Sequence, residues 1–440
     1  MPALFSPGPI PEHLPGEPRR RRAPTPVLIL HILLRTITVS VLGALGIVLW
    51  PLYLIAVAIW GWPPNVPRLA QVRRYIGLAF SVRPPSPGLP SLVRIWVLLA
   101  ILRKCALTPI AGLAWLLDEL LYGRALRDVK IEAPLIEISA GRSGSTQLAR
   151  YLEDDPQLAA PSLLQCFFPY LWLWRLAPRT LGKIISRDRV CTLLESMLSP
   201  EFLQRHEADP FRTDTFDGTL YISHLNHLAL SLGPDVSADD FGFASAAPHN
   251  RRLWSEDFVA LLDGVARRTL VHAGPGPDGE RRFFVKGHFL AAASALEARY
   301  PDARFLTMIR EPAPRLRSAV NYLRVNPTDP VLGPPPWAWL SEAIVRTEVD
   351  YCEVEEEWFR REGGARRCVL RFSTYKRDLE GTMAKVYREC LDTPTLPPHV
   401  PREHAPRKRT DYLIDRSLAD LRIDEEALNA RLADYIDWCR

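Results

Sequence analysis

The sequence predicts an α/β protein, a parallel sheet flanked by helices, preceded by a hydrophobic membrane-associated region. Three observations lead to this fold class. Four short apolar runs lie between residues 133 and 373, and an amphipathic helical pattern follows each of them. This alternation is typical of βα units, whose strands pair in parallel. A glycine-rich, hydroxyl-rich loop follows the first run, and long apolar stretches precede it.

Composition excludes several other classes. The chain has 440 residues, 47% of them hydrophobic, which is enough for a large buried core. Its net charge is only +5, spread over the whole chain, so we expect no nucleic-acid partner. The 7 cysteines include no CxxC pair, which argues against a zinc site or a disulfide framework and favours a reducing compartment.

The chain divides into five parts by composition. Within the second part, Thr36 to Trp60 contains no Asp, Glu, Lys or Arg, and a helix of this length can cross a bilayer core of roughly 30 Å. The parts are a disordered Pro/Arg-rich tail (1–26), a hydrophobic membrane segment (27–60), a Pro-rich linker (61–90), a second hydrophobic or amphipathic helical region (91–130) and an α/β domain (131–440).

The membrane topology stays open at this level. Five arginines precede the first apolar segment and four follow it, so the positive-inside rule gives no clear orientation. Pro51 suggests a bent, re-entrant segment. Leu92 to Tyr122 is interrupted by charged residues; it could lie at the interface, cross the membrane or pack on the α/β domain.

The elements of the α/β domain follow in order. Most of 156–280 is expected to be helical, with loops at Asp209–Asp217 and Gly274–Glu280. The expected strands are Ala133–Ala140, Arg282–Gly287, Ala303–Arg310 and Arg367–Ser373, and the helices that follow them begin near Ser145, Phe289, Pro312 and Thr374.

The loop after the first strand predicts an anion site. It reads Gly141, Arg142, Ser143, Gly144, Ser145 and Thr146. Glycines allow close backbone approach to a phosphate, and the following helix presents unpaired N–H groups with a partial positive charge. The arrangement is P-loop-like, but no Lys precedes the hydroxyl pair, which disfavours an ATP- or GTP-driven motor.

A second pattern lies in Phe305–Arg324. A strand ends at Arg310, Pro312 opens a helix, and Ser318 lies within its second turn. Arg310 and Ser318 can therefore converge on one anion.

Together these motifs resemble the sulfotransferase family, which uses 3′-phosphoadenosine 5′-phosphosulfate (PAPS). The resemblance implies that Arg142, Ser143, Gly144, Ser145 and Thr146 hold the 5′-phosphosulfate and that Arg310 and Ser318 hold the 3′-phosphate. It also places a Lys at the end of the strand before the second motif, here Lys286. The resemblance covers the βα units, leaves the first 130 residues unmatched, and implies no metal.

The implied reaction is in-line transfer of a sulfuryl group to a hydroxyl of a small-molecule or lipid acceptor, such as a glycolipid. Charge stabilisation would supply most of the catalysis, as in phosphoryl transfer. Arg142 and the N–H groups after it would stabilise the leaving phosphate, and Lys286 would act near the bridging oxygen.

The general base is the weak point of the resemblance. Many relatives carry a Glu shortly after the first helix, but Pro161–Phe168 contains no acid, and Gln165 cannot accept a proton usefully. The stretch Arg205–His227 concentrates ionisable side chains, which suits a loop over a pocket. Its candidates, ranked, are Glu207, His206 and His224, with Asp214, Asp217 and His227 behind them; His288 lies outside the stretch.

Two other functions remain open, a nucleotide-dependent kinase or NTPase and a catalytically degenerate membrane-bound scaffold. Because PAPS is made in the cytosol, we expect a membrane-associated enzyme with a cytoplasmic catalytic domain; a Golgi type II membrane protein is the alternative. The sequence does not determine the oligomeric state.

Overall fold

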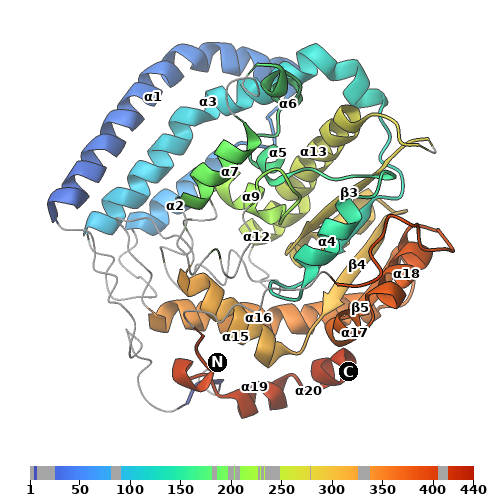
Figure 1. The fold of residues 1–440 in the computed structure, drawn as a ribbon. Helices are drawn as coiled ribbons and strands as arrows, with labels where there is room; N and C mark the ends of the chain where they lie inside the picture. Colours follow the sequence, from blue (N-terminus) through green and yellow to red (C-terminus); the bar gives the residue numbers. More distant parts are fainter. Residues whose placement is uncertain are drawn as a thin grey trace.

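The computed structural model describes residues 4–6, 25–80, 91–180, 186–196, 203, 209–225, 228, 232, 248–277, 279–325, 337–404 and 415–440. Within them, five strands form one sheet flanked by helices, which confirms the predicted fold class (Figure 1). The strands are β1 (Leu135–Ile138), β2 (Leu158–Ala159), β3 (Arg282–Gly287), β4 (Arg304–Ile309) and β5 (Arg366–Arg371).

The sheet has the order β2-β3-β1-β4-β5, and every pair of neighbours is parallel. The first strand of the chain therefore lies at its centre, with Leu135 opposite Phe284 of β3 and Arg304 of β4. The edge strand β2 lies in the stretch expected to be mostly helical. Its two residues are too few for a sequence pattern, and only pairing with β3 makes them a strand.

Helices surround the sheet. A π-helical turn (Leu253–Asp257) joins α12 to α13, and a 3-10 turn (Leu290–Ala292) precedes α14. The helices of the domain are α4 (Ser145–Glu153), α5 (Leu163–Phe167), α6 (Leu171–Leu176), α7 (Arg187–Ser196), α9 (Asp217–Ser223), α12 (Pro248–Arg252), α13 (Phe258–Ala273), α14 (Ala293–Arg299), α15 (Pro312–Val325), α16 (Trp337–Arg360), α17 (Phe372–Arg377), α18 (Leu379–Cys390), α19 (Glu425–Arg431) and α20 (Ala433–Cys439).

Both faces of the sheet are covered, because successive strand residues alternate between two cores. Leu135 and Leu306 pack with α4 and α18, whereas Ile136 and Phe305 pack with α13 and α14. All four residues of β1 are buried. The central strand is thus covered on both faces, and the loop that follows it lies between the two layers of helices.

Three further helices precede the sheet: α1 (Thr25–Trp60), α2 (Leu69–Phe80) and α3 (Ser91–Asp128). By length and apolar composition alone, α1 and α3 could each cross a membrane. The structure places α2 within the stretch expected to be a linker. The second half of α3 packs on the domain, where Trp115 and Leu116 join the same core as α13.

Candidate active site

The loop between β1 and α4 has the backbone of an anion cradle. Arg142 and Gly144 have positive φ angles of 67° and 99°. A Cβ at Gly144 would lie 2.7 Å from the ring of Phe372, so only glycine fits there. The expected strand Arg367–Ser373 ends earlier than predicted, because α17 begins at Phe372 and brings this ring against the loop.

The same loop has an unsatisfied polar group. Ser143 is fully buried, and its Oγ has no hydrogen-bond partner within the described residues. No side chain caps the N-terminus of α4. Buried hydroxyls normally have partners, and helix N-termini favour anions, so the residues present fit a phosphate or phosphosulfate group.

The two predicted anion motifs meet. Nε of Arg142 donates a 3.0 Å hydrogen bond to Oγ of Ser318, and Nη1 of Arg310 donates a 2.8 Å hydrogen bond to the carbonyl oxygen of Arg142. The guanidinium of Arg142 lies over the ring of Tyr322 at 5.0 Å, and that of Arg310 over Phe372 at 4.5 Å. The loop after β1 and the motif after β4 therefore form one site.

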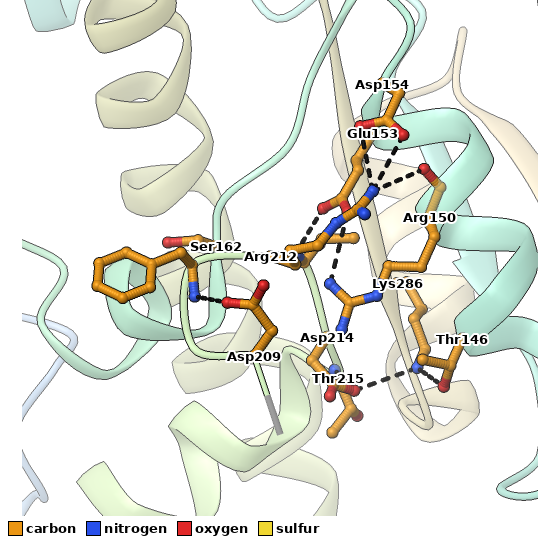
Figure 2. A network of polar contacts seen from close by, with 12 residues as sticks. Thr146, Arg150, Glu153, Asp154, Ser162, Asp209, Arg212, Asp214, Thr215 and Lys286 are labelled. Atoms are coloured by element: carbon orange, nitrogen blue, oxygen red, sulfur yellow. Dashed lines mark hydrogen bonds and ion pairs between the residues drawn. The ribbon is translucent and has the colours of Figure 1, made fainter. Parts of the chain in front are cut away.

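Lys286 reaches this site from the end of β3. Its side chain is only 2% exposed. Its Nζ donates to Oγ1 of Thr146 at 2.8 Å and lies 3.3 Å from Oδ1 of Asp214, as Figure 2 shows. A buried ammonium group that contacts the loop hydroxyl is placed to stabilise negative charge there.

His288 follows Lys286 by two residues and also lies next to the loop. Its Nδ1 lies 2.7 Å from the carbonyl oxygen of Ser139, and its backbone N–H donates to Oδ1 of Asp217 at 2.9 Å. Because a carbonyl only accepts, Nδ1 carries the proton and Nε2 keeps its lone pair. Nε2 lies 3.8 Å from the Cβ position of Gly141. Burial lowers the pKa of His288, which keeps the ring neutral.

Ser139 and Glu137 hold this histidine and were missed by sequence reasoning. Oγ of Ser139 donates to the buried Glu137 and accepts a 2.9 Å hydrogen bond from the backbone N–H of Met308. Burial raises the pKa of Glu137 to about 7. In the sequence, the sign of this arrangement is Glu137 itself, a carboxyl side chain inside an otherwise apolar predicted strand.

Arg150 and Arg212 were also missed. Arg150 lies one turn after Thr146 on the same face of α4, with Nε and Nη2 buried and without partners in the described part of the chain. Its Nη1 lies 3.4 Å from Glu153. Arg212 contacts Glu153 and Asp154 and so ties the 209–217 loop to α4 (Figure 2). The four-residue spacing of Thr146 and Arg150 in the sequence indicates that both side chains lie on one face of the helix.

Of the other candidate bases, Asp214 and Asp217 contact Lys286 and His288, whereas His224 lies near Arg68 and Lys104 instead. His224 is buried, pairs with Ser223 and has a pKa lowered to about 3, mainly by burial and further by Lys104 and Arg68. Glu207, His206 and His227 lie outside the described residues. Gln165 serves as a helix cap, since its side chain and Ser162 form a reciprocal capping box at α5.

A parallel sheet with an anion loop after its central strand, and a second anion motif after the neighbouring strand, defines a sulfotransferase-like fold. Two solved structures share it. The sulfotransferase STF9 from Mycobacterium avium matches with a TM-score of 0.60 and 18% sequence identity, over 88% of this chain and 95% of that one. The sulfotransferase STF1 from Mycobacterium tuberculosis matches with a TM-score of 0.51 and 18% identity, over 87% of this chain and 98% of that one. No protein-family model and no curated protein sequence matches the chain.

Proposed function

We propose that the protein transfers a sulfuryl group from PAPS to a hydroxyl of an acceptor. The observation that carries this proposal is the hydrogen bond from Arg142 to Ser318. It joins a 5′-type phosphate loop to a second anion motif in one site. A nucleotide with phosphates at both ends suits two such motifs, whereas ATP has no 3′-phosphate for the second.

Each motif has a role in the proposal. The loop from Arg142 to Thr146 would hold the 5′-phosphosulfate, with the orphan Oγ of Ser143 as one donor, and Arg310 and Ser318 would hold the 3′-phosphate. PAPS supplies an activated sulfuryl group with a phosphate leaving group. Lys286, at hydrogen-bond distance from Thr146, would stabilise the negative charge that grows on that phosphate.

His288 is the base that the geometry favours among the candidates that the structure describes. Its Nε2 faces Gly141 of the phosphate loop, and its tautomer leaves that atom able to accept the acceptor's hydroxyl proton. Asp217 and Ser139 fix the backbone and ring of His288, respectively. The proton therefore moves to a neutral imidazole, while Asp214 stays beside Lys286.

The proposed acceptor is a lipid or a lipophilic small molecule, and the proposed location is the cytoplasmic face of a membrane. Phe167 and Phe168 of the α5 region are exposed although both are large and apolar. Phe167 lies 3.9 Å from the Cβ position of Gly218, the neighbour of Asp217. Exposed aromatic side chains near the segment that carries Asp217, which accepts from the backbone N–H of His288, support an apolar acceptor.

The test is nucleotide binding followed by turnover. The product nucleotide, 3′-phosphoadenosine 5′-phosphate, should stabilise the protein against heat, by about 2.7 kcal/mol at a hundredfold excess over its Kd. ATP with magnesium should do much less. Equal stabilisation by both would favour a kinase or NTPase. Nucleotide binding without sulfate transfer to any acceptor tried would favour a degenerate scaffold.

A further inference from the structure

The outer surface of α1 is apolar between Thr36 and Trp60, apart from exposed hydroxyl side chains. Ile47 and Val48 are each 73% exposed, and no charged residue occurs between Thr36 and Trp60. The exposed hydroxyls of Thr36 and Thr38 donate back to helix carbonyls at 2.8 Å, so these groups are satisfied without water. Arg35 is turned toward α3, where its guanidinium lies 3.2 Å from the ring centroid of Trp96.

The helix α2 extends this surface. Leu69, Arg73, Ile76 and Phe80 are exposed at spacings of four, three and four residues, which places them on one face of the helix. The adjacent face carries Tyr75 and Ala79, which are buried against α3. Exposed Trp60 and Trp62 lie where α1 ends, and such aromatic side chains favour the membrane interface.

The helix α3 is fastened to the domain by polar groups, which argues against a crossing at its second half. Asp118 and Arg268 are buried and 2.8 Å apart. Asp118 also accepts hydrogen bonds of 2.8 Å from the backbone N–H groups of Leu171 and Trp172, at the start of α6. A bilayer around this half of α3 would have to displace α6 and α13.

The helices α1 and α3 run in the same direction. Arg35 meets Trp96, the Cβ position of Gly46 lies 2.9 Å from Ala106, and that of Gly112 lies 2.3 Å from Tyr53. A two-crossing hairpin needs antiparallel helices. Here the connection would have to recross the hydrocarbon with Arg73 exposed on α2. Figure 1 shows α1 beside α3 along the side of the molecule rather than projecting from it.

We infer that α1 and the exposed face of α2 lie in the plane of a membrane, embedded in one lipid leaflet, and that the chain does not cross the bilayer. The occupant is a lipid leaflet rather than a second protein, because protein interfaces combine an apolar centre with a polar rim, and α1 presents no charged rim from Thr36 to Trp60. Arg73 beside Ile76 and Phe80 suits anionic headgroups. This inference does not depend on sulfuryl transfer.

Flotation of the full chain with vesicles of phosphatidylcholine and phosphatidylglycerol tests the surface. Wild type should float. Ile47→Glu combined with Val48→Glu should reduce the bound fraction at least tenfold, while the melting temperature and binding of 3′-phosphoadenosine 5′-phosphate stay unchanged. Ala298→Glu adds a charge at an exposed helical position of α14 and should float like wild type. A wild type that forms a stable dimer without binding vesicles, and that the Glu pair dissociates, would overturn the inference.

A second experiment tests whether the chain crosses the bilayer, by finding the side of the membrane on which each end of the α1–α3 region lies. Thr25→Cys and Glu132→Cys are made separately with the two partly exposed native cysteines, Cys105 and Cys191, replaced by Ser. In sealed vesicles with bound protein, a membrane-impermeant maleimide should label both positions from the same side and at similar yield. Labelling of Thr25→Cys only after the vesicles are opened, with Glu132→Cys labelled at once, would show a crossing and refute the in-plane arrangement.

Discussion

Nε of Arg142 lies 3.0 Å from Oγ of Ser318, although the two residues are 176 positions apart in the chain. This contact joins the loop after β1 to the helix after β4. Because the carboxyl ends of parallel neighbouring strands share one edge of the sheet, the distance in sequence becomes a single anion site.

Ser318→Ala removes one hydrogen bond to the proposed 3′-phosphate and to Arg142. The Kd for 3′-phosphoadenosine 5′-phosphate should rise about tenfold, equivalent to about 1.4 kcal/mol, while adenosine 5′-phosphate binding should change little. Calorimetric titration of both nucleotides measures this. An equal loss for both would place Ser318 outside the 3′-phosphate site.

Lys286→Met should lower turnover more than nucleotide binding, because Lys286 faces charge that grows in the transition state. We expect kcat to fall by about 10²–10³, the range for loss of one charge-stabilising donor. Since Asp214 loses its ion pair with Lys286, a companion Lys286→Met/Asp214→Asn variant controls for the loss of that ion pair. Near-normal turnover in both would remove Lys286 from the mechanism.

His288→Asn should lower kcat by about 10²–10⁴ and leave nucleotide binding intact. The base must be neutral, and burial lowers its pKa below the ordinary value of about 6.5. In wild type, the acid limb of kcat/KM should therefore lie below pH 6.5, and activity should be lost as the pH falls through it. His224→Asn serves as a matched histidine control and should keep turnover. Loss of turnover in His224→Asn together with normal turnover in His288→Asn would instead assign the base to His224.

Gly144→Ala should destabilise the fold by about 1–3 kcal/mol and impair nucleotide binding, because the residue has a positive φ and no room before Phe372. Gly77→Ala in α2 is the control, since nothing lies within 4 Å of its Cβ position. That change should be neutral or stabilising by about 0.5–1 kcal/mol. Urea unfolding measures the free energy of unfolding of both variants. Equal changes would mean that the loop can adjust its backbone to hold alanine at position 144.

Glu137→Gln should become progressively more stable than wild type as the pH rises from about 5 to about 8. The folded-state pKa of Glu137 is about 7 because the side chain is buried, and its ordinary value is 4.5. Between these values the folded protein holds the extra proton, so the wild type loses stability as the pH rises. Urea unfolding at both pH values measures the difference. Glu132→Gln, at an exposed position, should show no such trend.

Several features of the fold and the site follow from the sequence alone. The four main strands, the Gly141–Thr146 loop and the Arg310–Ser318 spacing depend on local patterns, namely apolar runs and turn residues with fixed separations. The position of Lys286 at a strand end follows in the same way. Its contact with Thr146 also requires that β3 is the neighbour of β1, which only the structure shows.

The rest was decided by packing between distant segments. Periodicity cannot show that His288 faces the loop while His224 is enclosed beside α3, because each depends on contacts with segments far away in the chain. The same holds for the two-residue strand β2, for Ser139 and Glu137 behind the histidine, and for the parallel course of α1 and α3. A sequence states which side chains are apolar or ionisable; only the tertiary structure determines which of them face one another.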